Sequence, residues 1–411
     1  MNGPGAFAID RKGFLWVNDN YVPQPRLTAA CDGKRLLKFY PWGESFPGSP
    51  YFGGGLSGAG FGITLAPDGL VWVGNFGFAG RGCPTPSANS VSVFNPDGTP
   101  LASSPFTAGP ISWPQATMAD RKGTIWIANC AADSVTVYPK GRPREAFEVP
   151  VPIGPRGRRM KPFGMAIDHR GNAWMSGNFN DTLAVFAPDG DLIDVIPPRG
   201  PDGRIQLRRP MGVASDSRGN IWVSNSDFVD APCPAGGIPL TGPGTDPSIA
   251  LFRHDPGREP DPNSPFDGGG VSMPWGIAVD GDDTVWVANF GFPFDLRDPG
   301  NTPPWEEPNR VSHFCGADPA KCPLSKQGVG MAISPDVTGY PSAALARNTG
   351  IAIDPSGNVW LANNWKEIPL LRNPGGNAIV VLVGAAAPVK TPLIGTPRSF
   401  DRRFFERRHR Q

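Results

Sequence analysis

The chain repeats one strand–turn–strand unit seven times, and this repetition constrains its fold more than any other feature. In each copy a short apolar segment leads into a turn, and a second segment rich in β-branched residues carries a tryptophan. The copies cover 6–19, 62–75, 116–129, 164–177, 212–225, 276–289 and 350–363. Successive tryptophans are separated by 48 residues (Trp126 to Trp174) to 74 residues (Trp286 to Trp360). Periods of this size indicate a repeat architecture with one structural unit per copy.

Each unit encodes a β-hairpin. Most of the turns read Asp-x-x-Gly, in which aspartate accepts a backbone N–H and glycine supplies a left-handed residue. The second segment is apolar on both sides, as in Ile125-Trp126-Ile127, which is typical of a strand covered by neighbours on both faces. We therefore expect the tryptophans to lie in the core between units and not to contact a ligand.

These hairpins predict an all-β chain, a seven-bladed β-propeller of four-stranded antiparallel blades. A third strand follows in every unit, at 35–40, 90–94, 134–138, 182–186, 248–252, 310–314 and 378–382. Fourth strands are weaker, and the clearest candidates are 191–196 and, in the last blade, 388–393. We expect one propeller domain over 4–395. The basic tail 396–411 is expected to be flexible, with docking to a surface as the alternative.

Charge and apolar patterning exclude two classes of partner. The net charge is +1, so we expect no nucleic-acid partner, and no apolar run is long enough to span a membrane. Six cysteines without a Cys-x-x-Cys pair argue against a zinc site, and Cys315 and Cys322 could close a local disulfide. The even number of cysteines and their loop positions lead us to expect a secreted or periplasmic protein, and we expect a monomer. Because the first repeat begins by Ala6, we also expect that the start of the chain has lost an export signal.

Variation between the repeats points to one face of the propeller. The loops between second and third strands are tight at 130–134 and 178–182 but long at 20–34, 76–89, 226–247, 290–309 and 364–377. Four of the six cysteines lie in these loops. Long loops on one face of a rigid scaffold are where function usually resides, so this loop-rich face is the predicted binding site.

Two rings of residues are expected around the central opening of that face. The collar, the residue just before each first strand, comprises Gly5, Phe61, Gln115, Phe163, Met211, Trp275 and Thr349. The second ring ends each second strand and comprises Asp19, Asn75, Asn129, Gly177, Asn225, Asn289 and Asn363. An apolar collar beside an amide ring suits an apolar ligand held by a few hydrogen bonds. The alternatives are that the collar packs over the channel and that the asparagines tie off strand ends.

Catalytic groups are sparse on the predicted face. His169 falls in a turn on the opposite face, His254 and His313 lie in or just after third strands, and His409 belongs to the tail. The acids of the long loops include Asp227, Asp230, Asp295, Asp298, Glu306, Glu307 and Glu367. A histidine base therefore has no support there, and we expect no metal and no cofactor in a binding protein.

The repeated unit Pro-x-Gly-[Ile/Met/Val]-Ala-x-Asp-x-x-Gly-x-x-Trp resembles the NHL-repeat propellers, especially their streptogramin-lyase-like branch. The clearest copies are 162–174 and 274–286, and the resemblance covers about residues 4–395. It implies a propeller fold and, as an activity, metal-assisted elimination by histidine and glutamate on one face. Here the second strand ends in asparagine where that branch often has Trp-Phe-Thr-Glu. The gluconolactonase-like propellers are a second resemblance, with Asn348-Thr349-Gly350 as the nearest match to their Pro-Asn-Gly metal-ligand element.

Two main functions remain open from the sequence, beside a purely structural or assembly role. The first is an extracytoplasmic NHL-type propeller that binds a small molecule or a protein on its loop-rich face without catalysis. The second is a carbon–oxygen lyase or lactone hydrolase, which would need Mg²⁺ or Ca²⁺ held by the asparagine ring and nearby acids.

Overall fold

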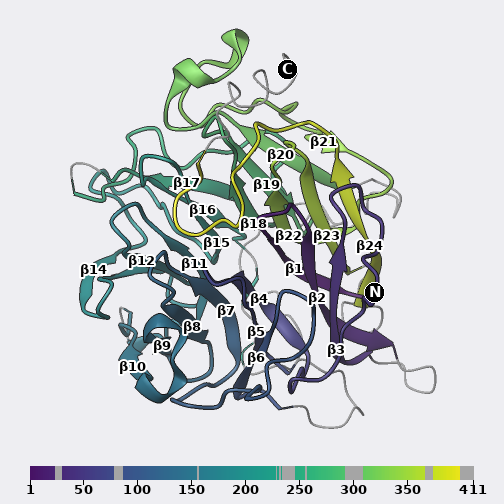
Figure 1. The fold of residues 1–411 in the computed structure, drawn as a ribbon. Coiled ribbons are helices and arrows are strands. Elements are labelled where there is room, and N and C mark those ends of the chain that lie inside the picture. Colours follow the sequence, from purple (N-terminus) through teal and green to yellow (C-terminus); the bar gives the residue numbers. More distant parts are fainter. Residues whose placement is uncertain are drawn as a thin grey trace, which may run out of the picture.

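The computed structural model describes residues 1–23, 30–77, 87–154, 157–227, 229–230, 233, 246–254, 257–291, 309–365 and 374–398. Within these residues there is no α-helix, and 24 strands form seven separate antiparallel sheets arranged around a centre (Figure 1). The predicted all-β, seven-bladed fold is confirmed. No helix in the described residues is long and apolar enough to cross a membrane.

The blades share three strands that follow one another in the chain, and the first of each lies innermost. The inner strands are β1 (Pro4–Ile9), β4 (Ala59–Leu65), β7 (Pro114–Ala119), β11 (Pro162–Ile167), β15 (Pro210–Ser215), β18 (Pro274–Val279) and β22 (Arg347–Ile353). The second strands are β2 (Leu15–Pro23), β5 (Val71–Asn75), β8 (Ile125–Asn129), β12 (Ala173–Gly177), β16 (Ile221–Asn225), β19 (Val285–Asn289) and β23 (Val359–Trp365). The third strands are β3 (Ala30–Phe39), β6 (Ser90–Phe94), β9 (Ser134–Tyr138), β13 (Thr182–Phe186), β17 (Ser248–Phe252), β20 (Arg310–Phe314) and β24 (Pro374–Leu382).

Within the described residues three blades have a fourth, outer strand and four blades have three strands, so the sheets contain three to four strands each. The outer strands are β10 (Phe147–Pro150), β14 (Leu192–Ile196) and β21 (Tyr340–Pro341). The remaining regular elements are the short 3₁₀ helices η1 (Pro139–Gly141), η2 (Pro143–Glu145), η4 (Pro319–Lys321) and η5 (Leu324–Lys326).

A Ser-Pro-aromatic segment replaces the outer strand in blades one, two and five. In blade two, Phe106 bridges Val91 of β6, and the Ser104 hydroxyl accepts the N–H of Val93 at 2.9 Å. The Phe106 ring stacks on Trp72 at 5.7 Å between centroids. Equivalent contacts are made by Ser49 with Tyr51 and by Ser264 with Phe266. In each case the serine hydroxyl accepts the third-strand N–H that a carbonyl of a fourth strand would otherwise have accepted.

The seven repeat tryptophans are buried, which confirms the prediction that they are core residues. Four of them also donate the indole N–H to the aspartate of their own turn, as Trp174 does to Asp168 at 3.0 Å. The same carboxylate accepts the backbone N–H of Arg170 and Asn172. Turn and core are therefore tied together, which explains why aspartate and tryptophan recur at a fixed spacing.

Glycines in the inner strands allow adjacent blades to approach closely around the axis. A Cβ atom on Gly164 would lie 2.2 Å from the carbonyl oxygen of Met211 in the next blade. The same position in blades two, five, six and seven is Gly62, Gly212, Gly276 and Gly350, and a Cβ atom on any of them would lie within 2.8 Å of backbone in the next blade. The ring then closes where the Thr349 hydroxyl donates to the Gly5 carbonyl at 2.9 Å.

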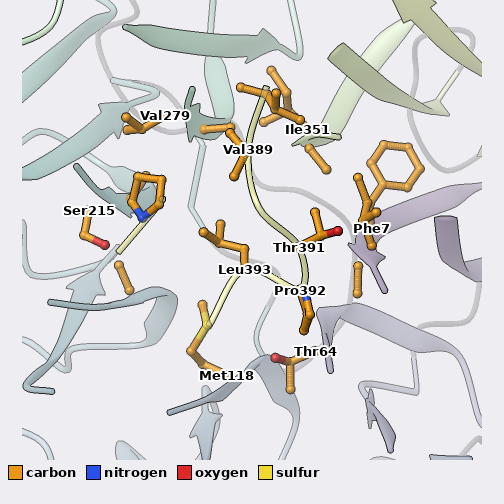
Figure 2. A pocket seen from close by; sticks show the side chains of 18 of the residues that line it. Phe7, Thr64, Met118, Ser215, Val279, Ile351, Val389, Thr391, Pro392 and Leu393 are labelled. Atoms are coloured by element: carbon orange, nitrogen blue, oxygen red, sulfur yellow. The ribbon is translucent and has the colours of Figure 1, made fainter. Parts of the chain in front are cut away.

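Residues 388–393 do not form the fourth strand expected in the last blade. Instead, 387–398, here called the C-terminal strap, crosses the turn side of the propeller. The N–H of Ala387 binds Asp280 in blade six, and the Thr391 hydroxyl donates to the Asp10 carbonyl in blade one. The strap runs inward toward the axis, where Val389, Pro392 and Leu393 line the channel (Figure 2).

Candidate functional site

The loop-rich face is described only in part. The long-loop residues 24–29, 78–86, 228, 231–232, 234–245, 292–308 and 366–373 lie outside the described residues, and with them five of the acids, Asp295, Asp298, Glu306, Glu307 and Glu367. Two predicted loops are partly strand, because β2 runs to Pro23 and β3 starts at Ala30, while β23 runs to Trp365 and β24 starts at Pro374. The tight connections of blades three and four are fully described.

The sequence predicted that the collar residues lie just before the inner strands. In the structure they lie inside these strands. Each inner strand begins one or two residues earlier, usually at a proline, and its pairing shifts register there. At β11, for example, Pro162 pairs with Gly177 and the next pair is Met165 with Met175. Such a bulge changes the direction of the intervening side chain.

The structure brings four collar residues together as a closed apolar plug. Phe61 lies 5.3 Å from Trp275 and 6.1 Å from Phe163, measured between ring centroids, and Met211 is fully buried beside them. The plug also includes Phe76, Cys130, Val229, Cys233, Met273 and Phe290. A disulfide between Cys130 of blade three and Cys233 of blade five joins its two sides. The collar aromatics thus pack on one another at the channel mouth.

Gln115, the polar member of the collar, is 1% exposed, and neither its amide nitrogen nor its oxygen has a hydrogen-bond partner in the described structure. A buried amide without a partner lowers stability because it loses its contacts with water. We expect Gln115→Leu to raise the free energy of unfolding by about 1 kcal/mol. Urea denaturation monitored by circular dichroism measures the change. A loss of stability instead would show that Gln115 holds an ordered water or ligand in the channel.

The asparagine ring is engaged in bonds within each blade. All five asparagines are buried, and the side-chain oxygen of each accepts a backbone N–H from the link before its inner strand. The pairs are Asn75 with Ser57 (3.1 Å), Asn129 with Ser112 (3.2 Å), Asn225 with Arg208 (3.2 Å), Asn289 with Ser272 (3.0 Å) and Asn363 with Ala346 (2.9 Å). Their amide N–H groups donate to carbonyls or hydroxyls nearby. A ligand at these amides would have to displace those bonds.

An aromatic and cationic cluster, not anticipated from the sequence, lies where the loops are tight. Phe179, in the short connection of blade four, is half-buried. Three cations approach its ring: the ammonium of Lys161 at 4.6 Å and the guanidinium carbons of Arg158 at 4.7 Å and Arg209 at 5.7 Å. We call these four residues and Asp181 the floor cluster. Cations over an aromatic face attract it through the quadrupole of the ring.

Carboxylates balance part of this positive charge. Asp181 lies 3.6 Å from Arg158 and 3.7 Å from Arg209, and Asp230 lies 2.6 Å from Arg209. Burial raises the pKa of Asp181 above its ordinary value, although the two arginines oppose this shift. Burial lowers the pKa of Lys161 below its ordinary value, and the positive charge of Arg209 acts in the same direction.

Two cations of the cluster share an unusual backbone conformation. Lys161 and Arg209 precede prolines and have positive φ angles of 47°, and Trp113 and Met273 occupy the same position in blades three and six. The only sequence signal for the cluster was two basic stretches before inner strands, at 158–161 and 208–209.

The described candidates for catalysis do not converge. Of the acids on the loop-rich face, Asp227 pairs with Arg208 at 3.2 Å and Asp230 with Arg209. His169 and His254 meet on the turn side, with ring centroids 4.0 Å apart. The described residues contain no group of three His, Cys, Asp or Glu side chains able to hold a metal ion.

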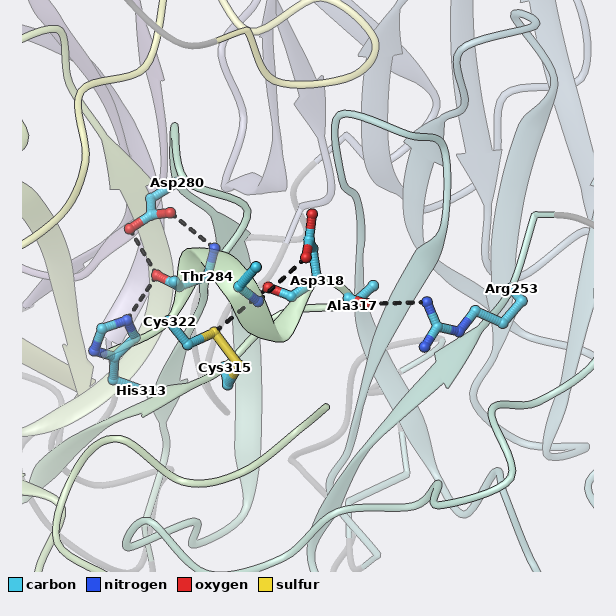
Figure 3. The surroundings of a disulfide bond; sticks show 9 residues. Arg253, Asp280, Thr284, His313, Cys315, Ala317, Asp318 and Cys322 are labelled. Atoms are coloured by element: carbon cyan, nitrogen blue, oxygen red, sulfur yellow. Dashed lines mark hydrogen bonds between the residues drawn. A yellow bond between two sulfur atoms is a disulfide. The ribbon is translucent and has the colours of Figure 1, made fainter. Parts of the chain in front are cut away.

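His313 is part of a buried network. Its ring stacks on Trp286, with 3.8 Å between the ring centroids. Its Nε2 lies 2.7 Å from the Thr284 hydroxyl, which also donates a hydrogen bond to Asp280 (Figure 3). Burial lowers the pKa of His313 to about 3, so the ring is neutral near neutral pH. The expected disulfide between Cys315 and Cys322 lies beside this network and is confirmed.

Comparison with solved structures identifies propellers of the same architecture. A streptogramin B lyase structure aligns with a TM-score of 0.52 and 14% identity, covering 91% of this chain and 92% of that chain. Virginiamycin B lyase from Staphylococcus aureus aligns with a TM-score of 0.53 and 13% identity, covering 88% of this chain and 94% of that chain. The likeness is one of fold. The resemblance noted in the sequence is thus confirmed at that level.

A third similar structure belongs to a different functional class. It is the extracellular domain of a candidate one-component system from B. thetaiotaomicron, with a TM-score of 0.53 and 13% identity. The match covers 94% of this chain and 41% of that chain. No protein-family model matches the sequence, and no curated protein does either.

Proposed function

We propose that this chain is an extracytoplasmic, non-catalytic β-propeller that binds a ligand or protein partner on its loop-rich face. The floor cluster carries the proposal, because a half-buried aromatic ring in the tight connection of blade four lies under three cations. Aromatic and arginine side chains are the residues most enriched in binding hot spots.

The charge of the cluster indicates the kind of group it would bind. The side chain of Arg158 is 38% exposed and that of neighbouring Arg159 is 51% exposed, while Asp181 and Asp230 are largely covered. The accessible charge is therefore positive and the buried charge negative. We infer that the partner presents a carboxylate or similar anionic group to the arginines and an apolar surface to Phe179.

Two disulfides in the described chain and the likeness to an extracellular domain support an extracytoplasmic location. The alternative is a metal-assisted lyase or lactone hydrolase with Mg²⁺ or Ca²⁺ at the asparagine ring. It would require the ring amides to give up their bonds within the blades, and the described histidines lie elsewhere.

A binding screen with matched variants tests the proposal. The probes are a panel of carboxylate-bearing peptides and sugar acids, measured by calorimetry with the full chain. We expect hits to lose at least about tenfold in affinity with Phe179→Ala and with Arg158→Gln, because each change removes a hot-spot contact. Lys326→Gln removes one positive charge on another part of the surface and is expected to leave the affinity within about twofold.

Two results would contradict the proposal. One is a set of hits that bind equally to all variants. The other is consumption of quinupristin or a lactone by the purified protein in the presence of Mg²⁺, followed by liquid chromatography, which would favour the enzyme.

A further inference from the structure

A basic pocket lies on the side of the propeller opposite the floor cluster. It has a volume of about 490 Å³ and is lined by turn residues of blades one, two and three and by the C-terminal strap. Four of its nine described lining residues are cations, namely Arg11, Arg121, Lys390 and Arg398. The size falls within the range of small-molecule sites, which is roughly 300–1,000 Å³.

The described lining of this pocket contains no carboxylate. Asp10, which precedes Arg11 in the turn of blade one, accepts the backbone N–H groups of Lys12 and Phe14. Asp68 lines the neighbouring groove and not this pocket. A chain with 38 basic and 37 acidic residues therefore places four positive charges around one pocket without a carboxylate among its described lining residues.

The strap positions these cations against the turns. Arg121 donates to the carbonyl of Ile394 at 3.3 Å and to the hydroxyl of Thr396 at 3.1 Å, and the N–H of Lys390 bonds the carbonyl of Arg398 at 2.9 Å. Arg11 donates to the carbonyl of Pro67 at 3.0 Å. Burial, and then the positive charge of Arg398, lowers the pKa of Arg121 below its ordinary value. Like charges are thus held together by backbone and hydroxyl contacts.

We propose that this pocket binds a small compound carrying two or more phosphate groups, at the turn-side mouth of the channel. Arginine matches phosphate with paired hydrogen bonds, and a multiply charged anion relieves the repulsion between the four cations. The Thr391 hydroxyl donates to the Asp10 carbonyl, whereas the Thr396 hydroxyl accepts from Arg121 and keeps its own O–H available to donate to an anion. This site is separate from the loop-rich face and does not depend on the function proposed there.

Calorimetric titration of the full chain with inorganic pyrophosphate tests the site. We expect binding that weakens as the salt concentration rises, because the pocket is open to solvent and its charges are screened. Arg121→Gln is expected to weaken the affinity at least about tenfold. Since Arg121 also anchors the strap, Arg11→Gln provides a second variant that leaves the contacts between Arg121 and the strap in place, and it is expected to have an effect of similar size.

Arg144→Gln is the matched control, because it removes one exposed positive charge outside the pocket. Its effect on the affinity is expected to stay below about twofold. An equal loss in Arg144→Gln and Arg121→Gln would overturn the proposal in favour of general electrostatic attraction. Absence of pyrophosphate binding at millimolar concentration would also overturn the proposal. This holds even if phosphatidylserine vesicles bind to the protein, because the site would then recognise a lipid surface and not a small phosphate compound. Tighter binding of citrate than of pyrophosphate would show that the assigned ligand class is wrong.

Discussion

Replacing both Cys130 and Cys233 by alanine is expected to lower the free energy of unfolding by about 4–5 kcal/mol. The bond joins positions 103 residues apart, in blades three and five, and so restricts the unfolded chain strongly. It also holds two sides of the channel plug, because Cys130 and Cys233 pack with Phe163 and Trp275. Chemical denaturation of the oxidised protein, monitored by tryptophan fluorescence, measures the loss.

The second described disulfide provides the control. Cys315 and Cys322 are 7 residues apart, so the same chain-entropy argument predicts a smaller loss, of about 2 kcal/mol, for the corresponding double alanine variant. The ratio of the two losses in unfolding free energy tests the chain-entropy explanation. Equal losses, or a smaller loss for the Cys130 and Cys233 variant, would mean that the long-range bond contributes little to holding the blades together.

Substituting alanine for Gly164 is expected to destabilise the propeller by about 3 kcal/mol. The new Cβ atom would lie 2.2 Å from the carbonyl oxygen of Met211, which belongs to the inner strand of the next blade. Backbone cannot yield here without moving a whole blade, so the cost falls on the packing around the axis. The shift in the urea midpoint at constant slope gives the change.

Gly328→Ala is the comparison for this effect. Its added Cβ would meet only the Met331 side chain, at 3.3 Å, outside the blades. We expect a change within about 0.5 kcal/mol for that variant. If Gly164→Ala were as mild as Gly328→Ala, adjacent blades would be able to separate at little cost, and the recurrence of glycine in the inner strands would need another explanation.

Much of the fold was predictable because its determinants are local and repeat. In six of the seven turns an aspartate accepts the backbone N–H groups two and four residues ahead, and the tryptophan follows at a fixed distance, so each of these hairpins is specified within about fourteen residues. Seven consistent copies then identify the architecture. The outer strands were less predictable, because in three blades a serine hydroxyl and an aromatic ring take the place of a strand.

The candidate sites were predictable only in part. The residue types of the collar pointed to the channel mouth, but the sequence could not indicate that Phe61, Phe163 and Trp275 would fill it by packing on one another. Phe179 and Arg209 are 30 residues apart and belong to different blades, so nothing in the local pattern pairs them. The same is true of Arg121 and Thr396 in the basic pocket.

The repeated tryptophan units by themselves determined the propeller, its seven blades and the burial of those tryptophans, since hairpin formation and strand burial depend on neighbours in the chain. Only the tertiary structure decided where apolar, aromatic and charged side chains gather on the molecule. The apolar plug, the floor cluster and the basic pocket each combine side chains from several blades or from the strap. Their proximity results from closing the ring, and the closed ring brings together residues that no repeat contains on its own.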